Sequence, residues 1–527
     1  MVCEQYNREA LRVKSALLTE RSNLAGVASA DRKALLARLS DMAEKKYKLT
    51  GEHFYKFFQC PHWIWYDIYG DQTKKGAIPP IIEMIHKGCL KHPKDLLGSR
   101  KFEEIKPELY KDLDEAFLAT LELMKQGKNI YHGVLMDGDW VGQPDLLEAR
   151  EGKSNFGNHY YVVYDIRSGR EIRDEYKFPL VFYSLILERL QGVLPRDAYI
   201  INADGEERSF MVEDFLDQFH LTRQRVEQIL EGEKPPPFLK SGCKHSPWYS
   251  LCVEEAENCG DVSLIYRLSQ NDQHRLYDIG IRTVGDLASA DLDYLRSRLE
   301  DWPFDKILRF HNQAQVLISN EPMILKKSEF PRVENEIYFD IESDPTDAID
   351  YLLGILVKRS DGSANYQKFL AMDKSEEGKI WREFLDFLES LKDFVIYHYS
   401  SYEREVFSRL GQKYGVSKAL EDKFKNSTID LHLAVVEAVV LPLYFYGLKD
   451  VAQYLGFKWS QEDAGGAESV VWYNEWLESR RGGQAGDQKI LDKIIKYNED
   501  DVRATLFIKE WLERQKPRVS REKLPEE

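Results

Sequence analysis

An apolar segment at residues 336–343, EIYFDIES, carries two carboxylates, Asp340 and Glu342, near the start of the last third of the chain. The pattern predicts a β-strand, and residues two apart on a strand point to the same face. The mutual repulsion of the two groups must be relieved by protonation or by a cation such as Mg²⁺ or Mn²⁺. We predict a metal site here, with a solvated strand end and a surface salt bridge as the alternative.

The residues that follow predict a sheet around this strand. Residues 350–362 and 365–372 show strand patterns, and a helical pattern leads to the apolar strand FVIYHYS at residues 394–400. Mainly helical patterns continue from there. We therefore expect three antiparallel strands, a helix, a fourth strand and then helices.

Two later segments add further acidic groups. Glu403 closes the segment HYSSYE that begins at His398, and Tyr497 and Asp501 lie four apart on one face of a predicted helix. Together with the acidic pair, these segments resemble the DEDD exonuclease family of the ribonuclease-H-like superfamily, whose motifs are D-x-E, H-N-x-x-F-D and Y-x-x-x-D. The chain departs from the second motif, with Tyr399 in place of Asn and Glu403 in place of Asp.

The resemblance implies phosphodiester hydrolysis with two divalent ions, Mg²⁺ or Mn²⁺. It assigns the ions to four carboxylates, Asp340, Glu342, Glu403 and Asp501. By the same resemblance Tyr497 helps to position the attacking water, and a core-packing aromatic is the alternative. We expect Asp500 to be a solvated helix residue, and a ligand role in a different helix register is the alternative. Asp430 is a weaker site candidate that we expect to cap a helix.

A second group of nuclease-like positions lies in the first half of the chain: His92, Asp145, Asp165, Arg167 and Tyr183. They resemble the RecB-like branch of the PD-(D/E)xK nucleases, and the whole layout resembles putative RecB-like nucleases fused to a ribonuclease-H-like domain. Arg167 stands where that family has a catalytic lysine, and Pro179 stands where it has a glutamine. Because arginine stays protonated and fork-shaped, it poorly replaces a compact amine that positions water. We predict a weakened or inactive site, and binding without cleavage, a structural remnant and retained catalysis remain open.

Three cysteines resemble part of the iron–sulfur ligand set of RecB-like nucleases. Cys60 matches the first ligand, and Cys243 and Cys252 match the outer two of the last three, but Ser246 stands at the middle position. Such clusters need four ligands. We expect retained thiols without a cluster, and an iron–sulfur or zinc site completed by His245 or Cys259 is the alternative.

A chain of 527 residues exceeds what one hydrophobic core supports, so we expect a multidomain α/β protein. The predicted parts are a helical arm at 1–48, a RecB-like nuclease core at 49–233, a cysteine segment with a helix-hairpin-helix-like element at 234–325, and a ribonuclease-H-like DEDD domain with a mixed sheet and flanking helices at 326–527. In the third part, Arg282 beside the turn at Gly280 is the predicted nucleic-acid contact. An ordinary packing turn is an equal alternative.

The leading functional hypothesis is a metal-dependent nuclease, a 3′-to-5′ exonuclease on single strands that takes DNA in preference to RNA. The formal net charge of −16 argues against tight nonspecific binding to DNA. Neither a membrane span nor a signal peptide is evident, so we expect a cytoplasmic protein without a membrane partner. The alternatives are a ribonuclease-H-type endonuclease and a noncatalytic nucleic-acid-binding subunit with protein partners in a defence or repair complex.

Overall fold

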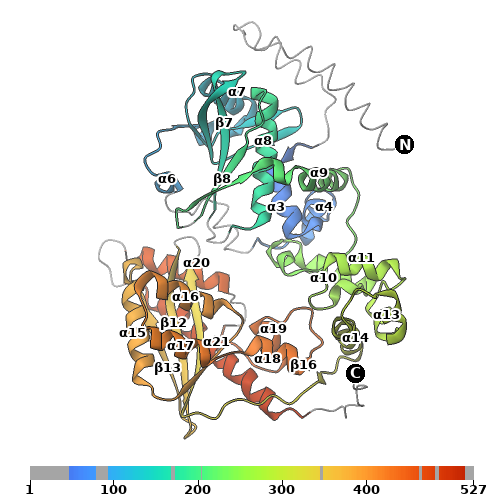
Figure 1. Cartoon of the computed structure of the whole chain (residues 1–527), viewed down its shortest axis with the longest axis vertical. Coiled ribbons are helices and arrows are strands. Elements are labelled where there is room, and N and C mark those ends of the chain that lie inside the picture. Colours follow the sequence, from blue (N-terminus) through green and yellow to red (C-terminus); the bar gives the residue numbers. More distant parts are fainter. Residues whose placement is uncertain are drawn as a thin grey trace. The chain divides into compact units, whose positions relative to one another are not determined.

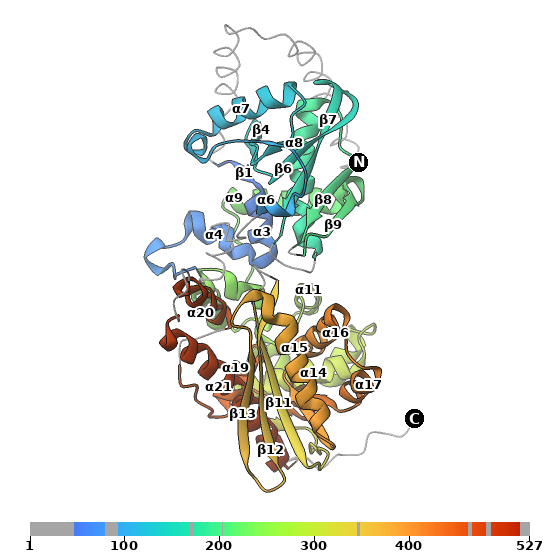
Figure 2. The same ribbon diagram turned by 90° about the vertical axis from the view of Figure 1, so that its left-hand side faces the viewer.

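The computed structural model describes residues 47–78, 93–167, 172–202, 204–344, 348–461, 466–480 and 486–516 (Figures 1 and 2). Nearly all of the predicted helical arm at 1–48, and also His92, lie outside the described residues. The chain divides into two compact units, Met1–Gly70 with His92–Pro235 and Asp71–Lys91 with Pro236–Glu527. Among the described helices, none has an apolar run long enough to cross a lipid bilayer.

The first unit is built on a six-stranded sheet with the order β2-β3-β6-β7-β8-β9. Its strands are β2 (Glu103–Glu104), β3 (Ile130–Tyr131), β6 (Leu146–Ser154), β7 (Gly157–Ile166), β8 (Asp197–Ile201) and β9 (Glu207–Met211). The antiparallel pair β6 and β7 forms the centre, and β8 joins β7 in parallel. Helix α8 (Lys177–Gln191) packs against β7, and the apolar side chains of both fill the core of this unit.

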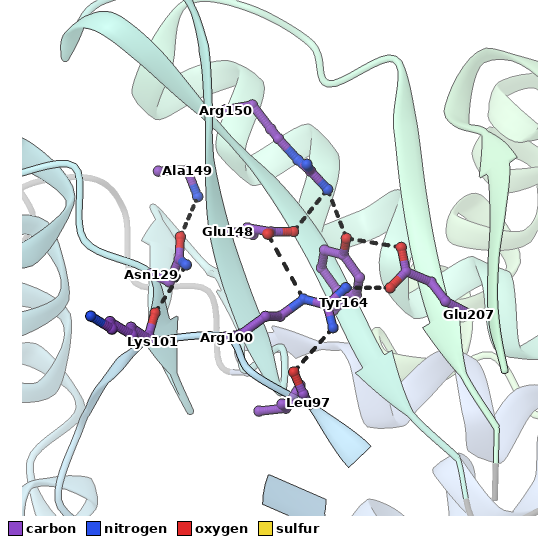
Figure 3. Close-up of polar contacts among 9 residues, drawn as sticks. All are labelled: Leu97, Arg100, Lys101, Asn129, Glu148, Ala149, Arg150, Tyr164 and Glu207. Carbon is purple, nitrogen blue, oxygen red and sulfur yellow. Dashed lines mark hydrogen bonds and ion pairs between the residues drawn. The ribbon is translucent and has the colours of Figure 1, made fainter. Parts of the chain in front are cut away.

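The two faces of β7 have different chemistry, because successive side chains point to opposite sides of the sheet. Figure 3 shows the polar network around Tyr164, whose hydroxyl contacts Arg150 at 2.8 Å and Glu207 at 3.2 Å. Arg150 also pairs with Glu148 at 2.8 Å, and Arg100 pairs with Glu207. Each arginine in this network is thus balanced by a glutamate. The next residue, Asp165, belongs to the opposite face.

The second unit begins with a group of helices followed by a sheet. The helices are α10 (Tyr249–Cys259), α11 (Gln270–Asp278), α12 (Val284–Ser289), α13 (Leu292–Arg298) and α14 (Phe304–Ser319). The turn between α11 and α12 passes through Gly280 with φ +84°, a left-handed conformation that favours glycine. The predicted pair of short helices is therefore present at this position.

The five-stranded sheet of the second unit has the order β13-β12-β11-β14-β15. Its strands are β11 (Asn335–Asp344), β12 (Ile349–Arg359), β13 (Ala364–Leu370), β14 (Phe394–His398) and β15 (Thr428–Asp430). The first three are antiparallel, whereas β14 and β15 run parallel to β11, and helix α15 (Glu377–Ser390) connects the two groups. The three antiparallel strands, the helix and the fourth strand follow the order predicted from the sequence, whereas β15 was not predicted as a strand.

Strand β11 lies at the centre of this sheet and separates two apolar cores. The odd-numbered side chains of its apolar stretch enter the core formed with α15: Ile337, Phe339 and Ile341. Tyr338 enters the opposite core, formed with the long helix α21 (Gln488–Arg514). By strand alternation Asp340 and Glu342 continue on the side of Tyr338, toward α21.

Candidate metal centre

Three carboxylates from two distant segments meet in the second unit. Asp340 and Glu342 come from β11 and Asp501 comes from α21, and one carboxylate oxygen from each lies within 4.8 Å of the others. Tyr497 lies one helical turn before Asp501, and burial followed by the charge of Asp501 raises the pKa of the Tyr497 hydroxyl. The predicted spacing of both motifs thus brings these residues together.

Neutral donors hold two of the three carboxylates in place. The Nδ2 of Asn498 donates to Oδ2 of Asp340 at 2.7 Å, and the indole Nε1 of Trp459 donates to Oδ1 of Asp501 at 2.6 Å. The side chain of Ser469 lowers the pKa of Glu342 against the larger effect of burial. In the part of the chain that the structure describes, no lysine, arginine or histidine nitrogen lies within 4.0 Å of an oxygen of these three carboxylates. The group therefore holds its negative charges without an ion pair.

The pKa values of the three carboxyl groups are raised. Burial, followed by the charge of Asp501, raises the pKa of Glu342 to about 8, and burial raises the pKa of Asp501 to about 6. The pKa of Asp340 rises well above its ordinary value through burial and then through its acidic neighbours, Asp501 first. A cation would relieve this unfavourable concentration of charge.

Glu403 lies beside the same group but is not one of the three residues whose carboxylate oxygens lie within 4.8 Å of one another. It lies at the start of helix α16 (Tyr402–Tyr414), and its Oε2 is 3.5 Å from Nδ1 of His398, which also contacts the carbonyl oxygen of Ser400 at 2.5 Å. Burial raises the pKa of Glu403, and the neighbouring His398 opposes this rise. The charge of Glu403 is among those that raise the pKa of Asp340, so the two carboxylates interact.

The donor set fits divalent ions such as Mg²⁺ or Mn²⁺. The Oε1 of Glu342 and the Oε2 of Glu403 are buried, and neither accepts a hydrogen bond within the described residues. Leaving such an oxygen without a donor costs free energy, and hard cations prefer carboxylate oxygens. Asp340, Glu342 and Asp501 would hold an ion at their centre, and Glu403 would provide oxygens at the edge.

Three neighbouring residues have other roles in the structure. Tyr399 donates its hydroxyl to the carbonyl oxygen of Tyr446 at 2.8 Å, away from the carboxylates. Asp430 caps helix α18 (Leu431–Ala438), as predicted. The prediction that Asp500 is solvated is wrong: its carboxylate is buried and accepts from the backbone amide of Ser460 at 2.8 Å, because a preceding loop packs against this face of α21.

Asn498 and Trp459 were not predicted from the sequence. Asn498 is fully buried beside Tyr497, and a polar residue inside an otherwise acidic motif is a signal that could have indicated it. It sits over Gly354 of β12, where any side chain would overlap its Oδ1 atom. Trp459 belongs to a loop, and its sequence surroundings carry no pattern that links it to Asp501.

Residues 337–513 match the family model described as the RNase H superfamily. This region is a ribonuclease-H-like domain. The match includes Asp340, Glu342, Glu403 and Asp501, and it associates the domain with nuclease-type action on nucleic acid. No curated protein and no solved structure matches the chain.

The first unit contains a second acidic pair, outside the ribonuclease-H-like domain. Asp145 precedes β6 and accepts from the backbone amide of Ile166 at 2.6 Å. Asp165 of β7 forms an ion pair with Arg167. Burial raises the pKa of Asp165 well above its ordinary value, while Arg167 opposes this rise and Asp145 adds to it. The guanidinium thus lies where it partly neutralises both carboxylates.

The acidic pair of Asp145 and Asp165, together with the described residues around it, does not fit a divalent ion. The Nε2 of His132 lies 4.0 Å from Oδ1 of Asp145, but no third carboxylate, histidine or cysteine completes a ligand group there among the residues described. Tyr183 is buried, and its hydroxyl occupies the space that a side chain at Gly51 would need. Arg167 therefore places a positive charge beside both carboxylates.

The predicted cysteine ligands are buried in different units. Cys60 belongs to the first unit, and Cys243 and Cys252 belong to the second. Ser246, at the position of the missing ligand, is buried and accepts from the backbone amide of Trp248 at 3.1 Å. The loss of a cluster stays a prediction.

The turn at Gly280 presents an exposed arginine, but two of its amides are already bonded. The carboxylate of Asp286 accepts from the backbone amides of Arg282 at 3.0 Å and Thr283 at 2.8 Å. The guanidinium of Arg282 lies 5.0 Å from the ring centre of Tyr277. A phosphate would have to displace Asp286 to use these amides, so a contact with nucleic acid here would depend on the Arg282 side chain.

Proposed function

We propose that the protein is a divalent-metal-dependent nuclease whose ribonuclease-H-like domain shortens single strands from the 3′ end. The observation that carries this proposal is the group of Asp340, Glu342 and Asp501, which lie within 4.8 Å of one another and two of which are held by neutral donors. A surface that only binds phosphate gains nothing from such a group, because its charge repels nucleic acid. The noncatalytic alternative is therefore disfavoured.

The proposed reaction adds water to phosphorus and breaks the bond to the 3′ oxygen, so the products are a nucleoside 5′-monophosphate and a new 3′-hydroxyl end. Bound divalent ions would supply activation of the water and stabilisation of the leaving oxygen. Tyr497, one helical turn before Asp501, would orient the attacking water. Asn498 and Trp459 would fix the directions in which Asp340 and Asp501 present their oxygens.

We further propose that the first unit is a RecB-like domain that binds nucleic acid without efficient cleavage. Arg167 pairs with Asp165, and the backbone amide of Ile166 engages Asp145, so both carboxylates already have partners.

The test is a cleavage assay with single-stranded DNA, duplex DNA, RNA and hybrid, each labelled at the 5′ end. We expect a ladder of shortened products with Mg²⁺ or Mn²⁺, none with EDTA, and none from the folded Asp340→Asn variant. A circular single strand should resist cleavage if the enzyme needs an end. Cleavage of the circle would support the endonuclease alternative, and unchanged cleavage by Asp340→Asn would refute the proposed site.

A further inference from the structure

A lysine stands at the edge of the carboxylate group of the ribonuclease-H-like domain. Lys449 is the second residue of helix α19 (Leu448–Tyr454), which packs against α21 (Figures 1 and 2). Its Nζ lies 4.9 Å from the ring centre of Tyr497 and 5.6 Å from that of Trp459. The indole of Trp459 donates to Asp501, and Tyr497 lies one helical turn before Asp501 on α21. Two aromatic faces thus hold the ammonium group beside the site.

Among the described residues, this ammonium group has no carboxylate partner in direct contact. Lys449 is partly buried, and no carboxylate oxygen of the described residues lies within 4.0 Å of its Nζ. Its charge nevertheless acts on Asp501 and Glu342, whose pKa values it lowers against the larger effect of burial. Lys449 is therefore close enough to change the pKa values of these carboxyl groups, and its ammonium group can still donate hydrogen bonds to another anion.

The charges of the proposed site indicate which anion this is. Four carboxylates balance two divalent ions, so Lys449 leaves the loaded pocket with an excess positive charge. A phosphodiester carries one negative charge, and more negative charge develops on its oxygens as water attacks. A compact ammonium with three donors suits a phosphate oxygen as a point contact.

We propose that Lys449 binds a non-bridging oxygen of the scissile phosphate and is a catalytic residue of this domain. The proposal rests on the proposed nuclease function. Lys449 keeps its proton throughout, and its contribution is electrostatic. The competing explanation is a structural one, in which the contacts of Lys449 with Tyr497 and Trp459 only fix α19 against α21.

Three variants separate these explanations. Lys449→Met removes the charge and keeps most of the length, and Lys449→Arg keeps the charge. Lys493→Met is the matched control, because Nζ of the exposed Lys493 lies 3.7 Å from the ring centre of Trp472 and makes the same kind of contact with an aromatic ring. Each full-length variant is compared with the wild-type protein in three measurements.

The measurements are binding of Mn²⁺ alone by electron paramagnetic resonance, binding of thymidine 5′-monophosphate in the presence of Ca²⁺ by calorimetry, and kcat on a labelled single strand. We expect Lys449→Met to bind Mn²⁺ at least as well as wild type. Loss of one charge-assisted bond should weaken binding of the nucleotide about tenfold and lower kcat about a hundredfold. Lys449→Arg should recover most of both losses, and Lys493→Met should match wild type.

Two outcomes would overturn the role of Lys449. If Lys449→Met matches wild type in nucleotide binding and kcat, the lysine does not contact phosphate. If it loses Mn²⁺ binding to the same degree as nucleotide binding, its role is structural. A wild-type protein that neither binds Mn²⁺ nor cleaves any strand would instead refute the proposed function, and the assignment of Lys449 would fall with it.

Discussion

The two acidic pockets of this chain differ in how their negative charge is neutralised. In the first unit, Arg167 pairs with Asp165 and the backbone holds Asp145, so the fold itself provides the positive charge. In the ribonuclease-H-like domain, the described residues that donate to Asp340 and Asp501 are the neutral side chains of Asn498 and Trp459. In the first unit an arginine therefore offsets part of the buried negative charge, whereas no cation among the described residues pairs directly with the carboxylates of the second group.

This difference distinguishes a structural ion pair, Asp165 with Arg167, from a group of carboxylates whose arrangement lowers the stability of the fold and suits a function. Burying carboxylates without counter-ions costs free energy, and such local inconsistencies are expected at functional sites. The raised pKa values of Glu342 and Asp501 are the physical signature of that cost. A raised pKa also occurs at Asp165, but there the arginine opposes it.

The largest expected effect compares Asp501→Asn with Asp145→Asn in the cleavage assay. Asp501→Asn removes a proposed metal ligand and should lower kcat by about a thousandfold or more. Asp145→Asn should leave kcat unchanged, because the first pocket is expected to lack efficient cleavage. Equal losses from both substitutions would show that the two pockets cut nucleic acid together, and the comparison would fail.

The next prediction is that removing one charge changes the free energy of unfolding in opposite directions in the two acidic groups. Arg167→Met leaves Asp165 buried without its partner and should destabilise the first unit by about 3 to 5 kcal/mol. Asp340→Asn removes a repelling charge and should stabilise the metal-free ribonuclease-H-like domain by about 1 kcal/mol. Hydrogen exchange of β7 and β11 reports the two units separately, which matters because a chain with two units need not unfold in one step.

A double substitution tests whether the effect of Arg167→Met comes from the unpaired charge of Asp165 or from the lost packing of the arginine side chain. Arg167→Met combined with Asp165→Asn removes both charges and should recover most of the lost protection of β7. If the single Arg167→Met variant already exchanges like wild type, the ion pair contributes little and Asp165 is neutral in the folded protein.

Much of the ribonuclease-H-like site was predictable because its parts follow local periodicity. Two residues apart on a strand and four apart on a helix are spacings that place Asp340 with Glu342 and Tyr497 with Asp501 on common faces. The order of strands and helices followed from the same patterns. For the first unit, the sequence itself showed that Arg167 stands in the place of a lysine. Its pairing with Asp165 agrees with the rule that residues two apart on a strand point to the same face.

The contacts between distant segments were not predictable. Asn498 donates to Asp340 across 158 positions of sequence, and this contact exists only because α21 packs over β11. Trp459 reaches Asp501 from a loop, and Lys449 approaches Tyr497 from a short helix. Such contacts depend on tertiary packing, for which hydropathy and spacing provide no signal.

The third prediction concerns pH and the effect of Mg²⁺ on stability. Glu342 and Asp501 have ordinary pKa values of 4.5 and 3.8, which rise in the folded protein to about 8 and about 6. Between about pH 4 and pH 8 the metal-free folded protein therefore binds more protons than the unfolded chain, and its stability falls as pH rises. Because Mg²⁺ binds the deprotonated carboxylates, the stabilisation by Mg²⁺ should grow over the same window.

Melting temperatures with Mg²⁺ and with EDTA, measured from pH 5 to pH 9, provide the check. Each proton displaced by the ion should change the stabilisation by up to about 1.4 kcal/mol per pH unit. Asp501→Asn should show almost no difference between Mg²⁺ and EDTA at any pH. A stabilisation that is equal at pH 5 and pH 8 would mean that the ion binds elsewhere.

The smallest expected effect comes from substituting two glycines, Gly354 and Gly51. Each leaves space for a polar side chain that lies beside one of the acidic groups. A side chain at Gly354 would overlap the Oδ1 atom of Asn498, and one at Gly51 would overlap the hydroxyl of Tyr183. Gly354→Ala should displace Asn498 from Asp340 and lower kcat about tenfold, the cost of one hydrogen bond to a charged group. Gly51→Ala should speed hydrogen exchange in the first unit and leave kcat unchanged. If Gly51→Ala lowers kcat as much as Gly354→Ala does, the first pocket takes part in cleavage despite its arginine, and charge neutralisation within the fold does not distinguish an inactive pocket from an active one.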